Sequence, residues 1–158
     1  MTDSPFMFKL TSQSLEKINL KKSLASPLAG AFSSFEGWVR NQHEGKKVIA
    51  LQYEAHEKLC LNESKKIIAE AKRKFNLINV RIFHRVGHLK VGEMAVWIGV
   101  VASHRDSAFK ACRYLIDEIK KRLPIWKREI YRDGDSGWVN CEIGSHTTVS
   151  PLTKNQLL

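Results

Sequence analysis

The chain has 158 residues, 43% of them hydrophobic and 27% charged, which is the composition of a globular protein with one domain and a proper core. Its 26 lysine and arginine residues outnumber its 16 aspartate and glutamate residues, giving a formal charge of +10 that favours nucleic acid, phosphorylated small molecules or an acidic protein as partner. No apolar run approaches the ~20 residues of a membrane-spanning helix, the first residues lack a signal-peptide layout, and the three cysteines show no C-x-x-C spacing. These features argue against a membrane protein, a disulfide scaffold and a zinc site, and they favour a reducing cytoplasm.

The first forty residues are expected to form a strand, a short helix and a second strand. Phe6–Leu10 has the pattern of a strand, and Leu15–Leu24 that of a short basic helix. Pro27–Gly30 is expected to be the loop that connects this helix to the next strand. Ala31–Val39 again has the pattern of a strand, in which Gly37 predicts a bulge or the close approach of another backbone.

The next segment is expected to be a loop, a strand and a long helix. Arg40–Lys47 is polar and contains glycine, so we expect a loop between two strands. Val48–Ala55 alternates as a strand does. One face of this strand should carry Ile49, Leu51 and Tyr53. Glu57–Phe75 shows the apolar stripe of a helix, whose lysine-rich remainder faces solvent.

Two further strands are expected in the middle of the chain. Val80–Val86 is the first, and Gly87–Gly92 turns the chain back. Met94–Ala102 is apolar on both faces, which predicts a central strand of the sheet.

A second helix is expected directly after this central strand. Ser103 followed by Asp106 has the spacing of a capping box, so the helix should begin at His104 and end before Pro124. Its first turn, with His104 and Arg105, offers free backbone N–H groups to an anion. Its apolar face should consist of Ala108, Phe109, Cys112, Leu115, Ile116, Ile119 and Leu123.

Charged residues at the end of this helix and on the following strand are candidates for chemistry. Lys120 lies at the border of the apolar face, where a lysine either covers the core edge or is partly desolvated and reactive; Lys121 points to solvent. On a strand, Lys127 and Glu129 share one face and Arg128 lies opposite.

The C-terminal part is expected to be a hairpin of Trp126–Ile130 and Trp138–Ile143, followed by a polar tail over residues 145–158. His56–Cys60 superficially matches a metalloprotease helix, but its fifth position is cysteine, so we do not expect a metal there. The chain contains no phosphate-binding glycine loop.

Several short motifs, each unspecific alone, follow one another between Ala29 and Val139. They are Phe35–Asn41, Tyr53–Ala55, His84–Gly87, Val91–Glu93, His104–Arg105, Ala108–Phe109, Asp117, Lys120, Pro124–Glu129 and Gly137–Val139. In order and spacing, this set resembles the large, catalytic subunit of molybdopterin synthase.

The resemblance implies an α/β (α+β) fold with a hammerhead-type core and an additional antiparallel β subdomain, in a single catalytic domain over residues 1–144. It implies a homodimer in which each copy binds one small ubiquitin-like sulfur-carrier subunit, giving a heterotetramer. The reaction implied is sulfur transfer from the carrier's thiocarboxylated Gly-Gly C-terminus to cyclic pyranopterin monophosphate (precursor Z), forming the molybdopterin dithiolene. It implies a cytoplasmic sulfurtransferase with no metal and no organic cofactor.

The resemblance also implies site residues by position. Lys120 would position and polarise the thiocarboxylate or its acyl intermediate, and Lys127 would stabilise negative charge as the cyclic phosphate opens. Glu129 would shuttle protons or hold Lys127. The implied substrate-binding residues are Phe35, Trp38, Val39, Arg40, His104, Arg105 and Arg128.

The sequence departs from the family in two respects and leaves two alternative functions open. Gly137 stands where a basic residue is expected, and no arginine near the C-terminus is matched. A basic nucleic-acid-binding module and a non-catalytic scaffold that docks an acidic ubiquitin-like protein are the alternative functions.

Overall fold

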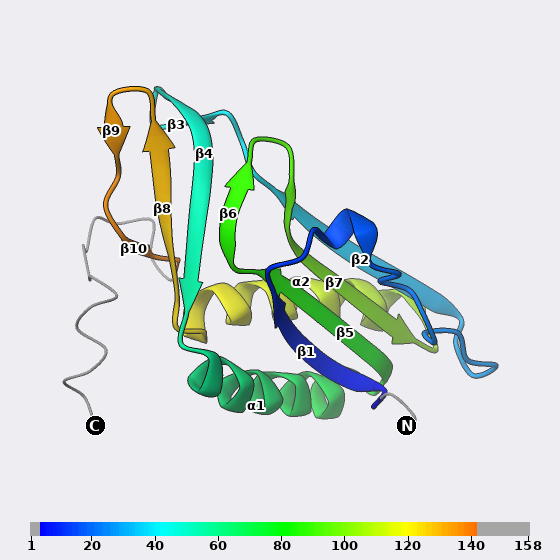
Figure 1. Ribbon diagram of the computed structural model, residues 1–158. Coiled ribbons are helices and arrows are strands. Elements are labelled where there is room, and N and C mark those ends of the chain that lie inside the picture. Colours follow the sequence, from blue (N-terminus) through cyan, green and yellow to red (C-terminus); the bar gives the residue numbers. More distant parts are fainter. Residues whose placement is uncertain (1–3, 142–158) are drawn as a thin grey trace.

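The computed structural model describes residues 4–141, within which two helices and two β-sheets are arranged as in Figure 1. The first sheet has the strand order β1-β5-β7-β2, with β1 and β5 parallel and the other neighbours antiparallel. Its strands are β1 (Phe6–Thr11), β5 (Leu77–Arg85), β7 (Met94–Ala102) and β2 (Ala31–Trp38). The second sheet is antiparallel and consists of β3 (Gln42–His43), β4 (Lys46–Ala55), β6 (Gly87–Lys90), β8 (Ile125–Tyr131), β9 (Gly134–Asp135) and β10 (Val139–Asn140). The predicted α+β fold with an added antiparallel sheet is confirmed.

Helices α1 (Glu57–Phe75) and α2 (Arg105–Arg122) pack on one face of the four-stranded sheet (Figure 1). The range predicted for α1 is confirmed. Its N-cap is His56, whose Nδ1 accepts a hydrogen bond from the Leu59 N–H at 3.3 Å, and its C-cap Asn76 is left-handed. The main core lies between helices and sheet, and β7 is buried along its whole length, as predicted for a central strand.

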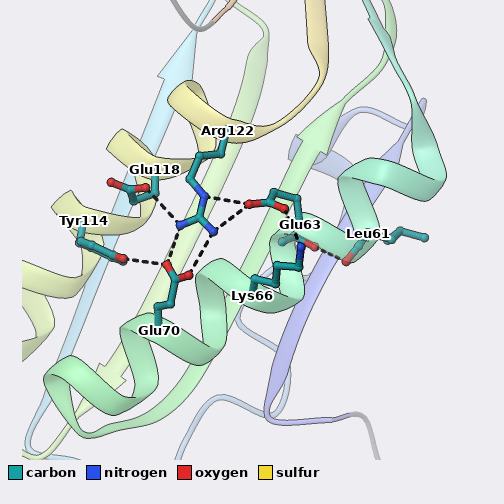
Figure 2. A network of polar contacts seen from close by, with 8 residues as sticks. Leu61, Glu63, Lys66, Glu70, Tyr114, Glu118 and Arg122 are labelled. Carbon is teal, nitrogen blue, oxygen red and sulfur yellow. Dashed lines mark hydrogen bonds and ion pairs between the residues drawn. The ribbon is translucent and has the colours of Figure 1, made fainter. Parts of the chain in front are cut away.

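An ion network joins the two helices, as Figure 2 shows. Arg122 in the last turn of α2 is the centre of the network, and Tyr114 donates a hydrogen bond to Glu70 at 3.0 Å. The carboxylates that Arg122 contacts belong to Glu63, Glu70 and Glu118. The network fixes the C-terminal end of α2 to α1.

The segment before β2 covers the opposite face of the sheet. Leu15 and Leu24 pack there against Phe83 and Trp97. The helix predicted over Leu15–Leu24 is wrong, because the segment holds only a short 3-10 helix, η1 (Leu15–Lys17), followed by turns. At ~100° per residue, leucines nine positions apart lie on opposite sides of a helix, so a helix would bury only one of them.

Helix α2 differs from its prediction at its start and on one flank. His104 is the N-cap, the helix begins at Arg105, and the cap makes no side-chain hydrogen bond, so the predicted capping box is wrong. Phe109 is 64% exposed, while Ala111 takes the expected place in the core. Phe109 lies ~80° from the buried Ile119 around the helix, on a flank that faces solvent.

Strand β4 and its neighbours also differ from the prediction. A register shift in β4 between Val48 and Ala50 leaves Ile49 49% exposed, so the predicted alternation fails at that residue. The segment predicted as a turn at Gly87–Gly92 contains β6, which pairs with β4. The hairpin after β8 turns at residues 132–133, since Tyr131 pairs with Gly134. Ile143 and the predicted tail lie outside the described residues.

Candidate active site

A cavity of about 110 Å³ lies where the end of α2 meets strands of both sheets. Its apolar wall is formed by Phe35, Gly37, Trp38, Ala95, Val96, Ile116, Ile119 and Ile125, and its polar lining by Tyr53, His84, Lys120, Lys127 and Cys141. Four of the predicted site residues are therefore brought together here: Phe35, Trp38, Lys120 and Lys127.

Gly37 shapes the rim of the cavity. The register of β2 against β7 shifts between Gly37 and Trp38, which confirms the predicted bulge. A Cβ atom at Gly37 would lie 2.7 Å from Cγ1 of Val96, so only glycine lets the two strands approach here. After the bulge Trp38 is 65% exposed at the rim, and its Nε1 donates a hydrogen bond to Glu36 at 3.1 Å.

The two lysines of the cavity have different surroundings. Lys127, in the middle of β8, has its Nζ 3.6 Å from Oε1 of Glu129. Glu129 is only 5% exposed, and it accepts a hydrogen bond from the hydroxyl of Tyr131 at 2.7 Å. Burial and this carboxylate raise the pKa of Tyr131 to about 12. Lys120, in the last turn of α2, has no ion pair with any residue from 4 to 141, so its charge is available to a ligand.

The cavity lining also includes three polar residues that were not predicted as site residues: Tyr53, His84 and Cys141. The rings of Tyr53 and His84 meet edge to face with centroids 5.1 Å apart. Burial lowers the pKa of His84 to about 4, with a further contribution from the charge of Lys120. Burial also raises the pKa of Tyr53, and it raises the pKa of Cys141 to about 11 although Lys127 and Lys120 oppose this. All three groups are therefore neutral near pH 7.

Two of these residues, Tyr53 and His84, could have been predicted as site residues from the sequence. They belong to the motifs Tyr53–Ala55 and His84–Gly87, which are part of the family resemblance. Cys141 gave no such signal. It reaches the cavity because β10 pairs with β8 and the Cys141 N–H then bonds to the carbonyl of Ile125 at 3.2 Å.

Three further predicted residues lie near the cavity without lining it. Arg128 is on the other face of β8, where it donates to Gln52 and stacks on Trp138 at 4.9 Å. Val39 is buried beside the second sheet, with its N–H bonded to the carbonyl of Glu93. Arg40 is exposed at the start of a polar hollow that the 40–45 hairpin forms.

His104 and Arg105 lie at the opposite end of α2 from Lys120. Fifteen residues of helix separate Arg105 from Lys120, which at ~1.5 Å per residue is about 22 Å. Within one copy of the chain these two residues do not reach the cavity.

Among residues 4–141, the cavity lining combines two cationic side chains with neutral hydrogen-bonding groups and contains no carboxylate. Such a lining suits an anion whose charge changes during a reaction. Within residues 4–141, no group of three His, Cys, Asp or Glu side chains is arranged to hold a metal ion. In the same part of the chain no helix is long and apolar enough to cross a membrane.

Fold and site together define a small α+β protein with a lysine-lined anion cavity, and comparison with known proteins identifies its family. The family model described as MoaE protein matches residues 10–122. The molybdopterin synthase catalytic subunit of Thermoplasma volcanium is 42% identical over 130 residues, which are 82% of this chain and 95% of that protein. The corresponding subunit of Synechococcus elongatus is 48% identical over 115 residues, covering 71% and 70% of the two chains.

Solved structures of similar proteins agree with this family assignment. The molybdopterin synthase structure from Staphylococcus aureus has a TM-score of 0.75 and 32% identity, covering 86% of this chain and 97% of that one. A complex of subunits 1 and 2 of the molybdopterin-converting factor from Helicobacter pylori has a TM-score of 0.70 at 19% identity, covering 96% and 99%, and supports the fold alone. This chain belongs to the MoaE family, as its motifs predicted, and its curated relatives are catalytic subunits of an enzyme. The nucleic-acid and scaffold alternatives are not favoured.

Proposed function

We propose that this chain is the sulfur-transferring subunit of a molybdopterin synthase. In this role it moves sulfur from the thiocarboxylated C-terminus of a small ubiquitin-like carrier to cyclic pyranopterin monophosphate, in two successive transfers. The observation that carries the proposal is the meeting of Lys120 and Lys127, from separate elements, at one cavity to which the described part of the chain contributes no carboxylate. The catalytic domain would extend over residues 1–144, in the cytoplasm.

The size of the cavity supports the entry of a carrier tail. A cavity of about 110 Å³ with a largely apolar wall suits the slender end of a glycine tail. The relatives of this chain from Thermoplasma volcanium and Synechococcus elongatus are named as subunits of a molybdopterin synthase, and this supports a partner subunit for the present chain as well. The pyranopterin would then lie at the rim, near the exposed Trp38 and Arg40.

The surroundings of the two lysines favour different roles. Lys120, without an ion pair in the described chain, is suited to bind and polarise the thiocarboxylate or its acyl intermediate. Lys127 is suited to stabilise negative charge as the cyclic phosphate opens. Glu129 is buried and held by Tyr131, and it is absent from the cavity lining, so holding Lys127 in place is favoured over shuttling protons.

A homodimer would bring the remaining predicted residues to the site. Strand β2 is an edge of its sheet and runs from Ala31, beside the start of α2, to Trp38 at the cavity rim. If two β2 strands pair antiparallel about a two-fold axis, the His104 and Arg105 of one copy approach the cavity of the other. There they would bind the phosphate, with Arg105 able to make a bidentate contact.

The test of the proposed function is a reconstitution. The purified chain is mixed with a thiocarboxylated sulfur carrier and cyclic pyranopterin monophosphate, and molybdopterin is measured by the fluorescence of its oxidised derivative. Product that depends on both the chain and the thiocarboxylate is the expected result. No product, with a carrier shown to be active with another synthase, would overturn the proposal.

A further inference from the structure

The lining of the cavity contains a histidine for which the proposed reaction has no assigned role. His84 is 7% exposed, it lies in β5, and it lines the cavity together with Lys120 and Tyr53. A histidine buried in this way is held by specific partners, so the atoms it offers to a ligand can be worked out from its contacts.

The hydrogen bond that His84 makes fixes its tautomer. Nδ1 lies 2.8 Å from the backbone carbonyl oxygen of Arg85, and a carbonyl oxygen only accepts, so Nδ1 carries the hydrogen. The imidazole is neutral, since burial keeps its pKa low. Nε2 is therefore an unprotonated acceptor. Within residues 4–141 no group donates a hydrogen bond to it.

The orientation of the ring is also fixed. The edge-to-face contact with Tyr53 and the bond to Arg85 hold the imidazole from two sides. Nε2 of His84 is thus an acceptor that carries no hydrogen, in a cavity whose two charged groups, Lys120 and Lys127, are donors only and whose Tyr53 hydroxyl can both donate and accept. A ligand that fills this cavity needs an anionic or carbonyl group for the lysines and an N–H group for His84.

The end of an extended glycine tail has this pattern, because a peptide N–H precedes the terminal acyl group. We propose that His84 is a binding residue for the carrier tail, whose last peptide N–H donates a hydrogen bond to Nε2. The bond would place the terminal acyl carbon beside Lys120 and strengthen the binding of tails that have this N–H. The inference rests on the proposed function, since it takes the carrier tail as the ligand.

The test compares two carriers and three variants. One carrier, in its carboxylate form, has the natural Gly-Gly end; the other is made by semisynthesis with the last peptide N–H replaced by an ester oxygen, which adds no bulk. His84→Asn keeps an N–H donor near the position of Nδ1 but lacks the Nε2 acceptor, whereas His84→Gln places an acceptor near the position of Nε2. His88→Asn, at an exposed histidine of β6, is the matched control.

With the wild type and His88→Asn, we expect the ester carrier to bind roughly 5–10-fold more weakly than the natural carrier, the usual effect of one lost hydrogen bond. With His84→Asn, the natural carrier should bind as weakly as the ester carrier, and His84→Gln should restore part of the difference. Equal affinity of the two carriers for the wild type would overturn the inference even if His84→Asn did not fold. So would an undiminished difference in His84→Asn. Product formation by the wild type in the reconstitution separates either result from a failure of the proposed function.

Discussion

Replacing Arg122 by methionine tests how the end of α2, and with it Lys120, is held in place. Arg122 bonds to Glu63 and Glu70 of α1 and to Glu118 of its own helix (Figure 2). Methionine retains much of the aliphatic length but removes every one of these bonds, and it leaves three carboxylates close together without their cation. We therefore expect a loss of stability and a loosened final turn of α2.

The magnitude follows from the exposure of the partners. The Arg122 side chain is 24% exposed and its three partners are 21–34% exposed. A hydrogen bond between charged groups contributes ~1.5–3 kcal/mol when buried and under ~1 kcal/mol when exposed, so about 1 kcal/mol per partner is reasonable here. Arg122→Met should then lower the free energy of unfolding by about 2–3 kcal/mol, which corresponds to a decrease in Tm of roughly 4–12 °C for a chain of this size.

Urea and thermal unfolding measure this loss, with Arg113→Met as control. Arg113 pairs with Asp117 at 2.8 Å, but the two side chains are 80% and 58% exposed, so about 0.5 kcal/mol or less is expected. Hydrogen bonds from Arg122 lower the pKa values of Glu63 and Glu70 below 4.5. The contribution of the network is therefore complete above this pH and is lost as pH falls through the lowered values, so wild type and Arg122→Met should converge in acid. A loss no larger than that of Arg113→Met, or a difference independent of pH, would refute the reasoning.

Three further predictions concern the cavity. Lys120→Ala should reduce turnover at least 100-fold with an unchanged Tm, whereas Lys121→Ala should be nearly silent; equal inactivation by both would show that only the general charge matters. Glu129→Gln should reduce turnover about tenfold, because Lys127 loses its partner, and should lower the phenol pKa of Tyr131 from about 12 towards 10 in an ultraviolet titration; an unchanged titration would contradict the contact. Gly37→Ala should cost ~1–3 kcal/mol in unfolding experiments, because its Cβ would lie 2.7 Å from a side chain of β7, and an unchanged stability would show that the strands separate readily.

Local patterns were sufficient to predict elements whose residues are buried on one continuous face or on both. The bounds of α1 (Glu57–Phe75) and the central position of β7 follow from hydrophobic periodicity, and the bulge follows from a glycine, Gly37, inside a strand. The helix predicted over Leu15–Leu24 was wrong because the positions of its leucines are determined by the sheet that they cover and not by a helical repeat. The face predicted for Ile49 was wrong because the register shift in β4 changes the face on which the following residues lie.

The candidate site divides in the same way. Lys120 was placed by helical phase and Lys127 by strand alternation, and both line the cavity. The role of His84 depends on contacts across two sheets, which no single stretch of sequence contains. Cys141 depends on the pairing of the two-residue strand β10 with β8. Long-range register therefore determined which residues could not be predicted.

The most direct test of sulfur transfer at the lysine cavity is a single-turnover experiment with a carrier whose thiocarboxylate sulfur is radiolabelled. The chain is mixed in excess with the labelled carrier and cyclic pyranopterin monophosphate, and the label is followed into the pterin product. We expect the label to move with the wild type and with Lys121→Ala, and to remain on the carrier with Lys120→Ala although the carrier is bound. Transfer by Lys120→Ala at the wild-type rate would contradict the assignment of the chemistry to this cavity.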